Sequence, residues 1–183
     1  HQVLQVRMMP LATVTGRLPR AVRDLCRSSG KEVQFEVEGA ALELDRTILE
    51  ALTDPLIHMI RNAIDHGIEE QGTVTVRAWR QRDQVMLQVA DNGRGMDPAA
   101  LRQRAIEKGL ISPAQATVMR DYDALQLVCL PGFSTAQQVS DTSGRGVGMD
   151  VVKAAVERLG GVLHIDAAPD SGTRVTLKLP LSV

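Results

Sequence analysis

Five polar side chains between Leu56 and Gly67 have the spacing that would place them together on one helix face. They are His58, Arg61, Asn62, Asp65 and His66. At about 100° per residue they fall within an arc of roughly 140°, opposite a set of apolar residues. An amide oxygen suits Mg²⁺, which keeps several waters and bridges substrate phosphates, and a guanidinium contacts phosphate oxygens. A phosphate and metal site is therefore favoured over a solvated face, which would mostly carry Lys and Glu, although the segment alone fits either.

The two histidines of this segment do not have zinc spacing. His58 and His66 lie eight residues apart, whereas helical zinc sites pair histidines at i and i+4. We therefore do not expect a zinc site here.

A carboxylate followed by two glycines comes where a strand is expected to end. Asp91 follows the apolar run 85–90, and Gly93 and Gly95 come directly after it. A carboxylate in this place can accept a hydrogen bond from an exocyclic amine such as that of adenine, and glycines let the backbone approach a flat ligand closely. Asp-Asn-Gly is also common in plain turns, so this segment alone indicates little.

A glycine cluster precedes the helix expected from Met149. It consists of Gly144, Arg145, Gly146, Val147 and Gly148. Glycines at a helix N-terminus expose backbone N–H groups, and the helix dipole adds positive potential, so the segment suits a phosphate. It lacks the preceding strand of a dinucleotide fingerprint and the Gly-Lys-Ser/Thr of a Walker loop. Alone, it also fits a flexible linker.

The elements that position these residues follow from hydrophobic periodicity. Helices are expected over 1–29, with breaks at Pro10 and Pro19, then from Asp45 with a new start at Asp54-Pro55 to Gly67, over 98–108, and over 149–159. Strands are expected at 31–37 and in two antiparallel hairpins, 73–80 with 85–90 and 162–167 with 173–179. Such a mixture predicts an α+β fold built as a two-layer sandwich.

Composition narrows the class of protein. The chain has 183 residues, 44% hydrophobic and 23% charged, which suits one domain with a helical extension. Its net charge of −1 gives no reason to expect nucleic acid or an acidic membrane as partner. Cys26 and Cys129 are too few for a disulfide framework, so a reduced cytoplasmic setting is expected. Without a membrane-spanning run, a signal peptide or an initiator methionine, the chain is interpreted as a fragment of a longer protein.

In this order and with these gaps, the segments resemble the GHKL ATPase superfamily and, within it, the CheA-type chemotaxis histidine kinases. The motifs are similar to the N box at His58–Gly67, the first glycine box at Asp91–Gly95, the phenylalanine box at Pro131–Thr135 and the second glycine box at Gly144–Gly148. The forms particular to CheA-like kinases are D-P-L-I-H-M-I-R-N-A-I-D-H-G-I-E and S-G-R-G-V-G-M-D-V-V. Residues 7–10 and 18–24 resemble the end of the dimerisation helices, so the resemblance covers the whole chain.

The resemblance implies a fold and a division of the chain. The fold would be the Bergerat (GHKL) ATP-binding fold, a mixed sheet with helices on one face. Residues 1–29 would be the end of the dimerisation helices and a linker. Residues 30–183 would form the kinase domain, in which residues from about 121 to 145 would form an ATP lid. The connection after the N box is shorter than the family usually has, since only Glu70 and Gln71 precede Gly72.

The resemblance also implies ligands for particular residues. Asp91 would read the adenine amino group, with Thr173 supporting it through water, and Asn62 and His58 would hold Mg²⁺ or its waters. Arg61, Asp65 and His66 would line the phosphate side.

The remaining motif residues would shape the loops around ATP. Gly93, Gly95, Gly146 and Gly148 would let the loops wrap the nucleotide, and Phe133 would belong to the hinge of the lid. For Lys108, a phosphate contact and an ordinary helix cap are equally open.

The reaction implied is transfer of the γ-phosphoryl group of ATP to a histidine, which depends mainly on positioning and charge neutralisation. The four histidines of this chain are poor acceptors, so a separate phosphotransfer domain is the expected substrate. Response regulators would act downstream, a coupling protein and chemoreceptors would bind through other domains, and the full-length protein would be a homodimer. Nucleic acid and direct membrane insertion are not expected.

Three alternatives compete with this prediction. Clamp ATPases of the same superfamily place a glutamate four residues before the N-box asparagine, where this chain has His58. A nucleotide-sensing or scaffolding module would keep the motifs without catalysis. A membrane sensor kinase is disfavoured by the form H-M-I-R-N-A-I-D-H-G.

Overall fold

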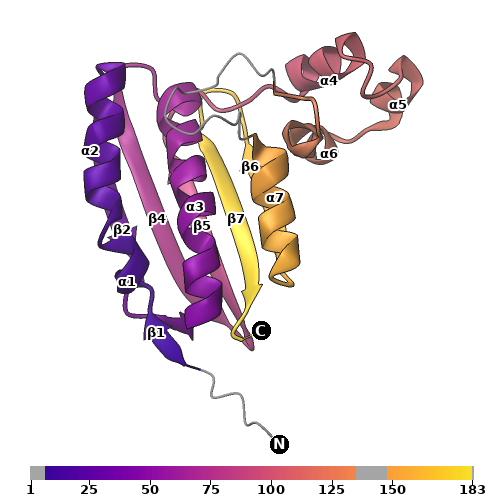
Figure 1. Ribbon diagram of the computed structural model, residues 1–183. Helices are drawn as coiled ribbons and strands as arrows, with labels where there is room; N and C mark the ends of the chain where they lie inside the picture. The colour runs from indigo at the N-terminus through magenta and orange to yellow at the C-terminus, as the bar shows by residue number, and fades with distance from the viewer. Residues whose placement is uncertain (1–6, 135–147, 183) are drawn as a thin grey trace, which may run out of the picture.

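A five-stranded mixed sheet forms one layer of the protein (Figure 1). A computed structural model describes residues 7–134 and 148–182. The strand order is β2 (Glu32–Glu38), β4 (Gln71–Gln81), β5 (Gln84–Asp91), β7 (Thr173–Pro180) and β6 (Val162–Ala167). The pair β2–β4 is parallel and the other three pairs are antiparallel. Both predicted hairpins are therefore confirmed.

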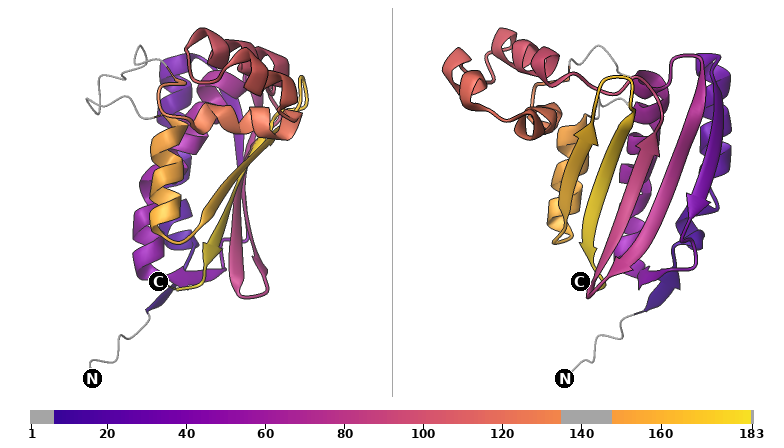
Figure 2. Two further views of the ribbon diagram at one scale, coloured as in Figure 1. Left: turned by 90° about the vertical axis from the view of Figure 1, so that its right-hand side faces the viewer. Right: turned by 180° about the vertical axis from the view of Figure 1, so that it is seen from behind.

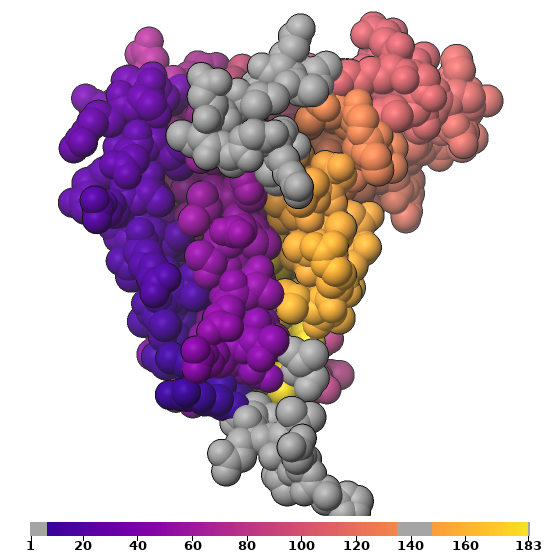
Figure 3. Space-filling model, in the orientation of Figure 1, coloured from indigo at the N-terminus to yellow at the C-terminus, as the bar shows by residue number. Residues whose placement is uncertain are grey.

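Three helices cover one face of this sheet and leave the other face open (Figure 2). They are α2 (Leu18–Ser29), α3 (Arg46–Asn62) and α7 (Met149–Arg158), and they lie side by side in the space-filling view (Figure 3). Alternate residues of the central strands, such as Val76 and Leu87, are fully buried beneath the helices, as a sheet with one covered face requires. The predicted two-layer α/β sandwich is confirmed.

A group of short helices lies beyond the end of the sheet, next to α7 (Figure 1). It comprises α4 (Pro98–Glu107), α5 (Pro113–Val118), α6 (Asp121–Leu125) and the 3₁₀ helix η2 (Gln126–Cys129). Asp97 caps α4, since its side chain accepts a hydrogen bond from the backbone N–H of Ala99. The helix expected from Pro98 is thus confirmed.

The first described residues differ from the predicted helical extension. Strand β1 (Met8–Pro10) pairs with β3 (Glu43–Asp45), and a short helix α1 (Ala12–Thr15) follows. Pro19 lies in the first turn of α2, where a proline costs no backbone hydrogen bond. Leu11, Leu18 and Val22 are buried in the same core as the helices of the sandwich. Residues 1–6 of the predicted extension lie outside the described residues.

Helix α3 corrects a second prediction, because it runs without a break through Pro55. Asp45 is its N-cap, as expected, with a side chain that accepts from the Thr47 N–H at 2.9 Å. A proline inside a helix removes one backbone hydrogen bond at a cost of roughly 3 kcal/mol. Burial of Leu52 and Leu56 on either side of Pro55 contributes about 1.5–3 kcal/mol each and offsets that cost.

After Asn62 the helix continues as a wider π-helical turn, η1 (Ala63–Gly67). The N–H of Ile68 closes this turn by donating to the carbonyl oxygen of Ala63 at 2.9 Å. A π turn of this kind is frequent at functional sites. Across the described ranges 7–134 and 148–182, no helix is both long and apolar enough to cross a membrane.

Candidate functional site

The polar face predicted around Asn62 divides into two parts. His58, Arg61 and Asn62 are half-buried on the last turns of α3. Asp65 and His66 are exposed on η1, where the wider turn rotates them away from positions calculated at 100° per residue. The Lys31 ammonium donates to the carbonyl oxygens of Ile64 and Asp65 at 2.6 and 3.0 Å, so η1 is held by a lysine that was not among the predicted site residues.

Asn62 contacts the start of α7. Its Nδ2 lies 3.2 Å from the sulfur of Met149, the first residue of that helix. Gly148 caps α7, and a Cβ added there would lie 3.6 Å from the Cβ of Ser134. The N box, the end of the phenylalanine box and the end of the second glycine box therefore lie together. Thr135, Gly144, Arg145, Gly146 and Val147 lie outside the described residues.

The end of η1 packs directly against the first glycine box. A Cβ added at Gly67 would lie 2.8 Å from the carboxyl atoms of Asp91, and one added at Gly93 would lie 1.9 Å from the carbonyl oxygen of Gly67. The Arg94 N–H donates to the same Gly67 oxygen at 2.9 Å, and the Arg94 guanidinium donates to the carbonyl oxygen of His66. A side chain at position 93 would overlap the Gly67 backbone, and one at position 67 would displace the Asp91 carboxyl group, so these two motifs form one junction.

The carboxylate of Asp91 is the most enclosed charged group of this junction. Burial raises its pKa, while hydrogen bonds from the backbone of Gly93 and Thr173 act in the opposite direction. The Gly93 N–H donates to Oδ1 at 2.9 Å, and the β5–β7 register pairs Asp91 with Thr173. Gly93 and Thr173, which are distant in sequence, are thereby brought to one carboxylate, which can accept a further hydrogen bond from a ligand.

Two other glycines allow close backbone approach around Asp91. Gly95 has φ +67°, and a Cβ there would lie 1.9 Å from the carbonyl oxygen of Ala168. Gly172 has φ +74°, and a Cβ there would lie 2.0 Å from the carbonyl oxygen of Asp91. Both positions need a left-handed backbone and the absence of a side chain. Gly172 was not among the site residues predicted from the sequence.

Phe133 is 3% exposed and is held by cations from α4. The Lys108 ammonium donates to the carbonyl oxygen of Phe133. Lys108 Nζ and Arg104 Cζ lie 5.6 and 5.7 Å from the centre of its ring, within the range of cation–π attraction. Lys108 also occupies the C-cap position of α4. The contact of Lys108 with Phe133 therefore differs from both roles considered for this lysine, a phosphate ligand and a helix cap. Arg104 contacts the same ring and was not a predicted site residue.

His58 has donor chemistry that suits a metal or its waters. Its pKa is lowered, first by burial and then by the charge of Arg61, with Asp54 acting in the opposite direction. A neutral imidazole nitrogen and the Asn62 amide are therefore available on one helix face. The described residues contain no cluster of three or more His, Cys, Asp or Glu that could hold a metal. This donor set fits Mg²⁺ bound through one or two protein groups, waters and substrate phosphates.

Two surface hollows lie away from these residues. One, of about 490 Å³, lies between α2 and the start of β2. The other, of about 560 Å³, lies at the starts of β2 and β4 and reaches Asn92. Neither is lined by His58, Asn62 or Asp91. The candidate site is therefore defined by the convergence of its motifs and not by cavity volume.

Comparison with known proteins identifies a family and relatives that this chain matches. A family model described as histidine kinase-, DNA gyrase B-, and HSP90-like ATPase matches residues 51–183. The chemotaxis protein CheA of Halobacterium salinarum is 46% identical over 192 residues, covering 99% of this chain and 29% of that protein. The sensor histidine kinase CheAY of Helicobacter pylori is 45% identical, covering 99% of this chain and 24% of that protein.

A solved structure agrees with the fold. The nucleotide-free catalytic domain of the histidine kinase ThkA superposes with a TM-score of 0.64 at 13% identity, covering 98% of this chain and 97% of that one. The chain spans less than a third of the length of the two sequence relatives. Each of those alignments extends over 192 residues although the chain has 183, so those relatives carry residues that this chain lacks.

Proposed function

Because the chain belongs to the family of histidine kinase-, DNA gyrase B- and HSP90-like ATPases, we propose that it is the ATP-binding catalytic domain of a CheA-type histidine kinase. The single observation that carries this proposal is the junction at Asp91. A half-buried carboxylate, three closely packed glycines and the start of β7 meet there. Their combination suits recognition of a flat base that bears an amino group.

In this proposal the adenine amino group donates to the Asp91 carboxylate, and Thr173 supports it through water. Gly67, Gly93 and Gly172 let the backbone lie close to the base. Beyond its hydrogen bonds from the Gly93 and Thr173 backbone, the carboxylate has further acceptor positions, and partial burial favours a ligand that donates to them over one that does not.

The phosphate side of the proposed site lies along α3 and η1. Asn62 and His58 would hold Mg²⁺ or its waters, and bound Mg²⁺ would neutralise charge on the phosphates. Arg61, Asp65 and His66 would line the phosphates, together with Gly146 and Gly148. Residues 30–183 would form the kinase domain, following the end of the dimerisation helices at 1–29, with a lid at about 121–145 whose hinge includes Phe133.

The phosphoryl acceptor in this proposal is a histidine of a separate phosphotransfer domain. Among the described histidines, His58 and His66 belong to the nucleotide site, and His164 is hydrogen-bonded to Tyr122. The remaining partners would be response regulators downstream, a coupling protein and chemoreceptors bound through other domains, and a second copy in a homodimer. The setting would be the cytoplasm.

ATP hydrolysis is the second candidate function, because the family includes gyrase-like and HSP90-like ATPases. Those clamp ATPases place a glutamate four residues before the asparagine to activate water. His58 occupies that position here, and this favours the kinase.

The test combines this chain with a phosphotransfer domain and Mg-ATP and measures phosphohistidine. We expect transfer to the added domain, no stable label on this chain, and loss of transfer in Asn62→Ala. Gln103→Ala, an exposed amide on α4, is the matched control and should transfer normally. Transfer that survives Asn62→Ala would refute the metal assignment. ATP binding without any transfer would favour a sensing module, and phosphate release without transfer would favour the hydrolase.

A further inference from the structure

A stripe of arginines on α2 faces solvent. Arg20, Arg23 and Arg27 are exposed and fall within an arc of roughly 60° at helical spacing. Five arginines elsewhere in the described chain make side-chain ion pairs, and none of the six ion pairs found there includes an arginine of α2. The charge of this stripe is therefore directed outward.

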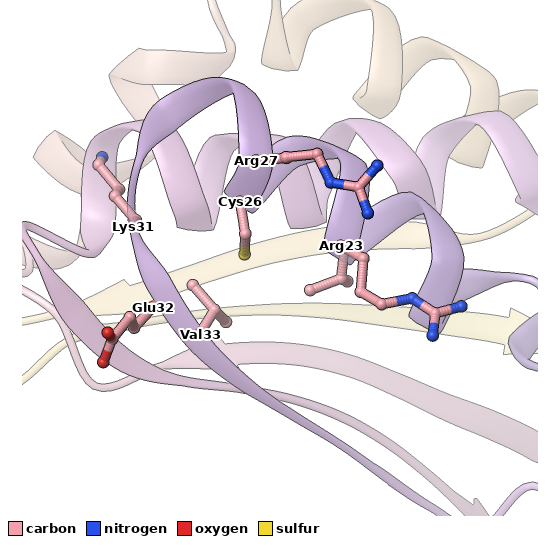
Figure 4. A pocket seen from close by; sticks show the side chains of 7 residues that line it. Arg23, Cys26, Arg27, Lys31, Glu32 and Val33 are labelled. Atoms are coloured by element: carbon pink, nitrogen blue, oxygen red, sulfur yellow. The ribbon is translucent and has the colours of Figure 1, made fainter.

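A groove runs beside the stripe (Figure 4). Its volume is about 490 Å³, and it is bounded by Arg23 and Arg27 on α2 and by Lys31 and Glu32 at the start of β2. Val22, Cys26 and Val33 supply an apolar floor, and the Cys26 sulfur points toward Val33 in Figure 4. The groove thus combines a cationic wall with apolar surface, a composition found at protein-docking surfaces.

The groove adjoins the proposed phosphate side of the nucleotide site. Lys31, which lines the groove, donates to the carbonyl oxygens of Ile64 and Asp65 in η1. A partner seated in the groove would therefore lie beside the turn that carries Asp65 and His66.

We propose that this α2–β2 groove, together with Arg20, docks an acidic face of the phosphotransfer domain; the inference rests on the proposed kinase function. Arg20, Arg23, Arg27 and Lys31 give four positive charges against Asp24 and Glu32, a local net charge of +2 on a chain whose net charge is −1. Opposite charge on the partner would increase its rate of encounter and orient it.

Nucleic acid and membrane surfaces fit this groove less well. No aromatic side chain lines it, so it offers no platform on which bases could stack. Glu32, Glu36 and Glu38 are exposed along the adjoining strand β2, so this face carries both signs of charge, which suits a protein surface with some basic side chains beside its carboxylates better than uniformly anionic lipid or phosphodiester. A protein with clustered carboxylates and a few apolar side chains is the occupant favoured by these features.

The test is the double charge reversal Arg23→Glu/Arg27→Glu in this chain, with the phosphotransfer domain as substrate. We expect the KM for that domain to rise at least about tenfold, with kcat and the KM for ATP unchanged. Salt should raise the KM of the unmodified chain more than that of the variant. Arg158→Glu, another exposed arginine at a helix end, is the control and should leave the KM unchanged.

The outcomes separate docking from catalysis. An unchanged KM for the phosphotransfer domain, with transfer intact, would overturn the docking site and leave the kinase function standing. Absence of transfer by the unmodified chain would refute the kinase function instead. Loss in the variant of binding to anionic phospholipid vesicles or duplex DNA, with no change in KM, would also overturn the proposal. If the variant does not retain the melting temperature of the unmodified chain, Arg23→Gln/Arg27→Gln serves in its place with the same expected direction.

Discussion

At the scale of single residues, the proposed specificity for adenine depends on the carboxylate of Asp91, because this group favours a ligand that donates a hydrogen bond to it. Asp91 accepts from the Gly93 N–H at 2.9 Å and is enclosed by Gly67 and Gly172. Its raised pKa reflects burial of a group that is ionised at neutral pH. The fold therefore retains an unfavourable charge at this point, and a ligand with an amino group would compensate for it.

Replacement of this carboxylate by an amide should affect stability and binding in opposite directions. Because the folded-state pKa of Asp91 is raised, the ionised group destabilises the fold at neutral pH, and this destabilisation disappears as the pH falls below the unfolded value of about 3.9. Asp91→Asn should therefore unfold at a higher temperature than the unmodified chain at pH 7, with the difference shrinking toward pH 3. Its dissociation constant for ATP should rise about ten- to hundredfold.

Thermal unfolding and ATP titration check this prediction. Asp83→Asn, in the exposed hairpin turn, should change neither property. If Asp91→Asn is less stable than the unmodified chain at pH 7, the ionised carboxylate stabilises the fold, and the prediction is contradicted.

The glycine contacts lead to a second prediction at this scale. Gly93→Ala places a Cβ 1.9 Å from the carbonyl oxygen of Gly67, so the two motifs must separate, at about 1–3 kcal/mol of unfolding free energy and with loss of ATP binding. Gly109→Ala, whose Cβ meets nothing within 4 Å, should lose only the roughly 1–2 kcal/mol of its left-handed backbone and keep ATP binding. Equal ATP affinity in the two variants would contradict the proposed role of the junction.

At the scale of elements, side chains of α6 and η2 hydrogen-bond the short helices to the edge strand β6. The Gln126 amide donates to the carbonyl oxygen of Ile165 at 2.8 Å and its Oε1 accepts from the Ile165 N–H at 3.1 Å. Tyr122 of α6 and His164 of β6 add a further hydrogen bond to the same edge strand. This fastening fixes the path of the chain from η2 toward Phe133.

Removal of that amide should loosen α6 and η2 selectively. Gln126→Ala should lower the free energy of unfolding by about 1–3 kcal/mol and speed hydrogen exchange at the Ile165 amide. Amides in the central strand β5 should exchange at unchanged rates. Uniform acceleration across the sheet would contradict a local role, and Gln103→Ala, on an exposed surface, is the control.

The elements also show what the sequence could predict. The Asp45 cap, the left-handed Gly30 that ends α2 and the alternating strands follow from local rules, and those elements were predicted correctly. The break expected at Pro55 was wrong because burial against the sheet outweighs one missing hydrogen bond. The π turn at 63–67 was not predictable, since its geometry depends on Lys31 and the first glycine box, which are distant in sequence.

At the scale of the whole molecule, the candidate site collects four separate parts of the chain at one end of the sandwich. The sequence supplied Asp91, Asn62, Gly93 and Thr173 as candidates, but their proximity required the β5–β7 register and the contact between α3 and α7. Contacts such as Arg104 over Phe133, or Gly172 against Asp91, carry no local sequence signal. They could be found only from tertiary structure.

The central claim, that Asp91 and its neighbours read adenine, is tested most directly by calorimetric titration of this chain with ATP and with GTP in the presence of Mg²⁺. We expect one ATP to bind per chain, and GTP, which presents a carbonyl where adenine has its amino group, to bind at least about a hundredfold more weakly, since its oxygen would face the half-buried carboxylate of Asp91. Equal affinity for the two nucleotides, or no binding of ATP, would contradict the account.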